Sequence, residues 1–158
     1  MIQEYIMNQL VEEFPELEWT VNYKTSNDNY GAVFYDGGDK PELNDTKARH
    51  VNYQIVIEHK NFDEAERLAF GSFNKIHGIK AVHTYHLDQP IFVQYIFAET
   101  EPLRIGVEND KMIYTLHFIL CEQSSLPQKP SHCCAELSLG LNVLLSLSQC
   151  KDNLLIAL

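Results

Sequence analysis

The stretch HVNYQIVIEHKNFDEAERLAF, from His50 to Phe70, changes its hydrophobic period within a few residues. Its first half alternates between two sets of side chains, which is typical of a strand with two different faces. Its second half repeats apolar residues at helical spacing, and Asn61 or Asp63 can accept hydrogen bonds from the free N–H groups of a first helical turn. The sequence therefore predicts a strand that leads almost directly into a helix.

The predicted helix has a buried stripe and a defined end. Its stripe consists of small and apolar residues at helical spacing: Ala65, Leu68, Ala69, Ser72, Phe73 and Ile76. Gly78 suits the position just past the C-terminus, because glycine adopts the left-handed backbone conformation without strain. We expect this helix to fold back onto the sheet that contains the preceding strand.

A second helix is predicted at the N-terminus, where Ile2, Ile6, Leu10 and Phe14 recur at every fourth position before Pro15. Strands are predicted at residues 18–24, 30–36, 51–58, 83–87, 90–103 and 112–120, and the first two are predicted to form a hairpin. The segment Glu108 to Lys111 has the composition of a turn. Strands joined by turns favour an α+β domain over residues 1–120, with a mostly antiparallel sheet and two helices packed on one face.

The character of the sequence changes at Cys121. Residues 121–158 are rich in Leu and Ser, and only 5 of these 38 residues are charged. No steady helical or strand period runs through them. Two interpretations of this C-terminal tail stay open: a terminal helix packed on the body or on a neighbouring subunit, and a non-native extension.

Charge and hydropathy exclude several classes of protein. Lys and Arg number 12 against 22 Asp and Glu, a formal charge of −10, which argues against a surface that binds nucleic acid by neutralising phosphate. No run of eighteen or more apolar residues is present, so no membrane span is expected. Glu4 stands where a secretory signal would carry basic residues, and we expect synthesis in the cytoplasm.

The residues that could carry chemistry do not form a recognisable site. His83 and His86 are three residues apart in a predicted strand, so they point to opposite faces and make a poor metal site with His77. His117 and Cys121 lie in one strand, roughly 13 Å apart, too far for a nucleophile and its base. All four cysteines lie after residue 120, which argues against a disulfide framework. We expect no catalytic residue, metal or cofactor.

Three segments resemble the tail terminator proteins of long-tailed bacteriophages, which are also called tail completion or minor capsid proteins. They are the N-terminal helix, AVFYDGGDKPELNDTKARHVNYQIVIEHKNFDEAERLA and PIFVQYIFAETEPLRIGVENDKMIYTLHFIL. The resemblance covers about residues 1–120. It concerns the order of the helices and strands and the kinds of residues within them. The tail from Cys121 has no counterpart in it.

The resemblance implies a structural virion protein of the tail and neck region, not an enzyme. Such proteins form a ring, usually a hexamer, that caps the tail tube, ends its polymerisation and joins the tail to a head or neck completion protein. DNA would pass through the lumen without specific binding, and neither a cofactor nor a membrane is involved. The alternatives are another head–tail connector or tail-tube ring subunit, or a small ligand-binding domain or enzyme with a site built from scattered polar residues.

The candidate interface is the polar segment between the second and third predicted strands, residues 36–48. It is longer than a hairpin needs, contains two glycines and a proline, and carries charges of both signs. We expect it to contact another subunit, in the ring or on the tube. Its candidate contact residues are Asp36, Gly37, Gly38, Asp39, Lys40, Pro41, Glu42, Asp45 and Lys47.

Overall fold

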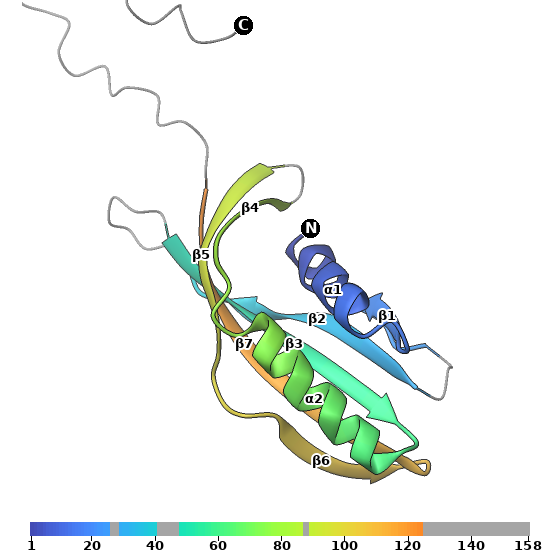
Figure 1. The fold of residues 1–158 in the computed structure, drawn as a ribbon. Coiled ribbons are helices and arrows are strands. Elements are labelled where there is room, and N and C mark those ends of the chain that lie inside the picture. The colour runs from blue at the N-terminus through green and yellow to red at the C-terminus, as the bar shows by residue number, and fades with distance from the viewer. Residues whose placement is uncertain (26–28, 41–47, 87–88, 125–158) are drawn as a thin grey trace, which may run out of the picture. The chain divides into compact units, whose positions relative to one another are not determined.

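A computed structural model describes residues 1–25, 29–40, 48–86 and 89–124 of the chain (Figure 1). The described elements all belong to one compact unit, Met1–Leu126. Both interpretations of the C-terminal tail fall outside the described residues, apart from its first four residues, which belong to the last strand.

The unit Met1–Leu126 is an α+β domain, as the sequence predicted. Its elements are α1 (Ile2–Glu13), β1 (Glu18–Val21), β2 (Tyr30–Gly38), β3 (Ala48–His59), α2 (Phe62–Ile76), β4 (Lys80–His86), β5 (Gln89–Ala98), β6 (Leu103–Glu108) and β7 (Lys111–Ser124). Among the described helices, none is long and apolar enough to cross a membrane.

All seven strands belong to one sheet. Six of them follow the order β1-β2-β3-β7-β5-β4, and β6 lies off this path and pairs with β7. The centre of the sheet is β7, which pairs with all of β3 on one side. On its other side β7 pairs with β6 near its start and with β5 near its end. Five of the six strand pairings among the described residues are antiparallel, and the pairing of β1 with β2 is parallel.

The predicted hairpin between the first two strands is therefore wrong. Glu18 lies beside Tyr30 and Val21 lies beside Val33, so the chain returns to the starting end of β1 before β2 begins. The intervening residues have turn composition, which indicates that the chain changes direction. Turn composition does not determine whether the next strand pairs in parallel or antiparallel, and this explains the error.

The predicted strand at residues 90–103 is also wrong, because it joins two elements. β5 ends at Ala98, and the separate strand β6 begins at Leu103. The predicted turn that follows is confirmed: Asn109 and Asp110 have positive φ angles of 50° and 62°, which is typical of a two-residue hairpin loop. The aromatic and aliphatic residues of β5 concealed the break at Glu99–Pro102.

The direct passage from strand to helix at β3 and α2 is confirmed. Asn61 precedes the helix, and its side-chain oxygen accepts hydrogen bonds from the backbone N–H groups of Asp63 at 3.0 Å and Glu64 at 3.3 Å. Two acidic residues in the first turn add favourable interactions with the positive end of the helix dipole. Gly78 follows the helix with a φ angle of +86°, as its position predicted.

Both helices contribute side chains to a single core cluster with the sheet. Figure 1 shows α2 lying along β3 and β7. Alternate residues of β3 enter it: Val51, Tyr53, Ile55 and Ile57. From α2, Leu68 is fully buried, whereas Phe73 is only partly buried at the margin. The two helices approach closely where Phe14 meets Gly71, since a Cβ atom on Gly71 would lie 2.6 Å from the ring of Phe14.

Candidate interaction surface

The predicted interface segment begins later in the chain than the sequence suggested. Asp36, Gly37 and Gly38 belong to β2 and not to a loop. Gly37 lies beside Asn52 and Gly38 beside Val51, after a bulge that follows Tyr35. The N–H of Asp39 donates to the carbonyl of His50 at 2.8 Å, which continues the pairing by one residue.

The remaining candidate residues of this segment are less well placed. Lys40 is exposed two residues after the end of β2. Pro41, Glu42, Asp45 and Lys47 lie outside the described residues. The role of the segment in contacting another subunit stays a prediction.

The strongest surface feature of the described residues is the outer edge of β6, which the sequence did not predict. Three aliphatic side chains of this strand are exposed: Leu103 by 46%, Ile105 by 63% and Val107 by 53%. Only β7 pairs with β6, so the other edge of β6 has no strand partner among residues 1–25, 29–40, 48–86 and 89–124. An open strand edge with exposed aliphatic side chains can accept a strand from another chain.

A β-bulge shapes this edge. Arg104 lies beside Tyr114 and Gly106 lies beside Ile113, so Ile105 is an extra residue in β6. Gly106 has a φ angle of +137°, which residues with a side chain rarely adopt. The bulge increases the local twist and turns the side chain of Ile105 out of the regular alternation. The most exposed aliphatic side chain of the strand is therefore presented at the bulge.

The histidines that suggested a metal site have other contacts. The Nδ1 of His77 accepts a hydrogen bond from the backbone of Ala98 at 3.1 Å, and its ring stacks on Phe73. The ring of His83 is tilted against Phe92, with centroids 4.8 Å apart. The side chain of His86 is outside the described part of the chain. Within that part, no group of three or more His, Cys, Asp or Glu residues could hold a metal ion.

Cys121 is buried within β7, and its thiol lies 3.6 Å from the side-chain oxygen of Gln94. His117 belongs to the same strand and is partly buried. The two side chains form no hydrogen bond with each other. Cys121 therefore contributes to the packing of β7 beside β5.

A cluster of polar side chains surrounds Glu58, whose own side chain is only 12% exposed. The hydroxyl of Tyr30 donates to this carboxylate at 2.5 Å, and the ammonium group of Lys24 donates at 3.0 Å. Lys111 lies 4.0 Å from the other carboxylate oxygen. Burial raises the pKa of Glu58, but the hydrogen bonds from Tyr30 and Lys24 outweigh burial, and the pKa is lowered. These contacts join β2, β3 and β7, which indicates a structural role.

Replacing Glu58 with glutamine should make the protein less stable at neutral pH, by about 1–3 kcal/mol, because hydrogen bonds to a charged group are lost. The lowered pKa means that the native carboxylate stabilises the fold above its ordinary pKa of 4.5 and loses this effect as the pH falls below it. Denaturant melts from pH 7 downward should therefore show the two proteins converging in acid. Glu66→Gln, on the exposed face of α2, is the control and should show no difference. A constant gap between Glu58→Gln and the native protein at all pH values would contradict the ionic role.

Another cluster of polar side chains lies where β3 begins and β7 ends. The Nε of Arg49 donates to Glu122, whose side chain is 3% exposed. The second carboxylate oxygen of Glu122 and the hydroxyl of Tyr53 are buried without a hydrogen-bond partner. Burial and then the charge of Glu122 raise the pKa of Tyr53. The Arg49–Glu122 pair fixes the two strands just after the end of the predicted interface segment.

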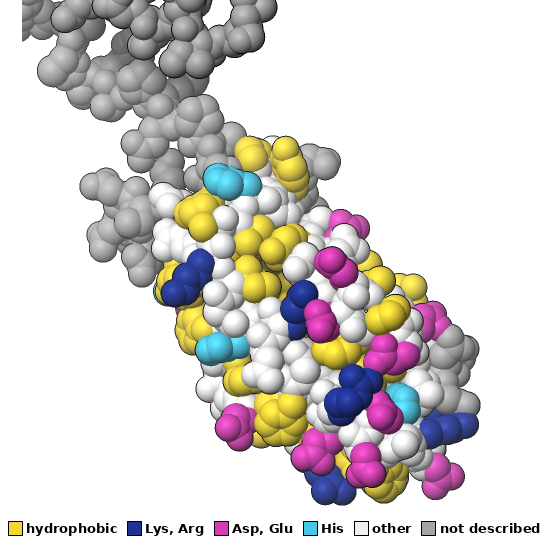
Figure 2. Space-filling model, in the orientation of Figure 1, with side chains coloured by type: hydrophobic (Ala, Val, Ile, Leu, Met, Phe, Trp, Pro, Cys, Tyr) yellow, Lys and Arg dark blue, Asp and Glu magenta, His cyan; other side chains and the backbone are white. Residues whose placement is uncertain are grey.

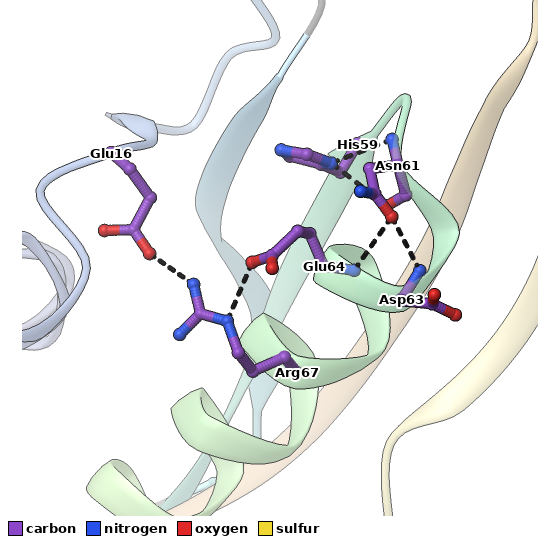
Figure 3. A network of polar contacts seen from close by, with 6 residues as sticks. All are labelled: Glu16, His59, Asn61, Asp63, Glu64 and Arg67. Atoms are coloured by element: carbon purple, nitrogen blue, oxygen red, sulfur yellow. Dashed lines mark hydrogen bonds and ion pairs between the residues drawn. The ribbon is translucent and has the colours of Figure 1, made fainter.

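The junction between β3 and α2 is tied to the segment after α1 by a network around Arg67 (Figure 3). The guanidinium group of Arg67 contacts Glu16 at 2.6 Å and Glu64 at 2.7 Å. A backbone hydrogen bond, and then Arg67, lower the pKa of the Glu16 carboxyl. All three side chains are about half exposed, so their ion pairs contribute little to stability. Charges of both signs are interspersed on this side of the molecule, which is typical of a solvated surface (Figure 2).

No protein-family model matches the chain, and no curated protein matches its sequence. Of the surfaces described above, the β6 edge departs most from an ordinary solvated surface, because three of its six residues are exposed aliphatics.

Proposed function

We propose that this protein is a tail terminator of a long-tailed bacteriophage, a structural subunit that assembles into a ring at the end of the tail tube. The observation that carries the proposal is the open edge of β6 with its three exposed aliphatic side chains. A protein that ends polymerisation must bind the last ring of a tube through an existing surface. An open strand edge does this without any chemical reaction.

The β6 edge is proposed as the surface that receives the tail-tube protein. A strand of the tube protein would continue the sheet beyond β6 through main-chain hydrogen bonds. Its apolar side chains would cover β6 on both faces of the sheet, because Leu103 lies beside Thr115 and Val107 lies beside Met112, which point to opposite faces of β7. The excess of acidic residues supports the second part of the role, because a ring of acidic subunits repels DNA and allows it to pass. The order of elements in residues 1–120 supports the terminator class over unrelated assembly proteins.

The principal alternative is another ring subunit of the head–tail connector or the tail tube. An open strand edge serves those proteins equally well. They differ in what happens after binding: a tube subunit continues to polymerise, whereas a terminator stops after one ring. Tail length in assembled particles therefore separates the two functions.

Replacing Ile105 and Val107 together with lysine should leave the melting temperature nearly unchanged, because both side chains are more than half exposed. The same change should prevent capping, because two charges would be buried against the tube. Phage particles assembled with this variant should have tails of uncontrolled length and no joined heads in negative-stain micrographs. The control is Phe70→Lys on α2, which replaces another exposed apolar residue. Normal, head-joined tails with the β6 variant would contradict the assignment of this edge.

A further inference from the structure

The sheet has two outermost strands, β1 and β4, and each has one edge without a strand partner among the described residues. β1 is parallel to β2, and four antiparallel pairings lead from β2 through β3, β7 and β5 to β4. Four reversals restore the original direction, so β1 and β4 run the same way. If a second copy continued the sheet with its helices on the same side, its β1 would pair with β4 in parallel.

The two edges carry opposite charge. The segment from Glu12 to Glu18 contains four glutamates and no basic residue. Lys75 and Arg67 pair with two of them, and Glu12 and Glu18 have no ion pair among the described residues. By contrast, β4 contains one lysine, two histidines and no acidic residue.

Lys80 is the available cation of the β4 edge. It is exposed and has no ion pair among the described residues. Its neighbours across the sheet can be followed from strand to strand. Lys80 of β4 lies beside Tyr95 of β5, which lies beside Cys121 of β7. Cys121 in turn lies beside His50 of β3. Residues side by side in neighbouring strands share a face of the sheet. Lys80 is therefore on the same face as His50, which is the face opposite the core residues of β3.

Glu18 is the matching anion of the β1 edge. It is exposed and lies beside Tyr30, which lies beside Glu58. Glu58 and His50 are eight residues apart in β3, so they share one face. Glu18 and Lys80 are thus on the same face of the sheet, at opposite edges.

Their positions along the strands also agree. Glu18 is the first residue of β1, and Lys80 is the first residue of β4. In a parallel pair the starting ends of both strands meet, so Lys80 of one copy would lie beside Glu18 of the next. A highly exposed tyrosine accompanies each edge, Tyr23 at 60% and Tyr85 at 62%, and adds apolar area to the contact.

We propose that the β4 edge of one copy binds the β1 edge of a second copy, with Lys80 beside Glu18 of that copy, so that the sheet continues between subunits. The contact joins two different surfaces of identical subunits, and repeated contacts of this kind close into a ring when the rotation allows it. The inference rests on the proposed function, because it names the contact that holds the ring together.

The test is a charge exchange on the full-length protein, with subunit association measured by sedimentation velocity. Lys80→Glu and Glu18→Lys should each weaken association by about tenfold or more, because an opposite-charge pair becomes a like-charge pair. The protein with both substitutions should associate nearly as well as the native protein. Glu66→Lys on α2 makes the same charge change as Glu18→Lys and should have no effect. Lys80→Gln, a milder change, should weaken association by a smaller factor and guards against misfolding of the charge-reversed variants.

The possible failures are distinguishable. If the native protein forms rings and Lys80→Glu and Glu18→Lys form them equally well, the proposed contact is wrong and the ring uses other surfaces. The same conclusion follows if the double substitution fails to restore association. If the native protein stays monomeric at all concentrations, both the contact and the proposed ring function are wrong.

Discussion

Leu68→Ala should lower the free energy of unfolding by about 2–5 kcal/mol. Leu68 is fully buried in the middle of α2, within the core cluster that joins both helices to the sheet. Truncation to alanine removes apolar contacts and leaves a cavity that the surrounding strands cannot close, because their backbones are fixed by pairing on both sides. Denaturant melts of the full-length protein measure the loss.

The control is Phe70→Ala, two residues further along the same helix. Phe70 is 38% exposed, so its removal opens no closed cavity and should cost much less than Leu68→Ala. Alanine favours the helix at both positions, so the difference between the variants reports burial. A loss below about 0.5 kcal/mol for Leu68→Ala would contradict the packing of α2 against the sheet.

Truncation after Leu120 should destabilise the domain strongly, whereas truncation after Leu126 should not. The sequence placed the end of the domain at residue 120, but β7 continues to Ser124. Its last residues pair on one side with the first residues of β3 and on the other side with β5. The shorter protein would lose these pairings, the buried thiol of Cys121 and the Arg49–Glu122 pair, for a combined cost of about 3 kcal/mol or more.

Thermal melts of the two truncated proteins measure this difference. We expect a cooperative transition for residues 1–126, which form one compact unit. We expect aggregation or a much lower melting temperature for residues 1–120, because the starts of β3 and β5 would be left as open edges. Equal melting temperatures would show that residues 121–124 contribute nothing to the fold.

The helices and their ends were predictable because their signals are local. Asn61 and Gly78 bracket α2, and the spacing of Ala65 and Leu68 identifies its buried side. These features depend on neighbours within a few residues along the chain. The parallel pairing of β1 with β2 was not predictable in this way, because it depends on contacts between segments whose connection has only turn composition.

The surfaces were harder to predict than the fold. The segment at Asp36–Gly38 was expected to be a loop because of its glycines, yet the glycines extend β2 beyond a bulge. β6 was hidden because it follows a longer aromatic strand, and because the bulge at Ile105 and Gly106 breaks the regular alternation of its residues. Its exposure follows from its place at the edge of β7, which no local pattern reveals.

The most direct test of the proposed function is the assembly state of the purified full-length protein, measured by mass photometry together with negative-stain microscopy. If the protein is a tail terminator, single closed rings with a central hole should appear. The mass of each ring should be that of a hexamer of the 18.2 kDa subunit. The rings should not stack into tubes, because a terminator stops after one ring. A monomer at every concentration, or a tube that keeps growing, would contradict the proposal.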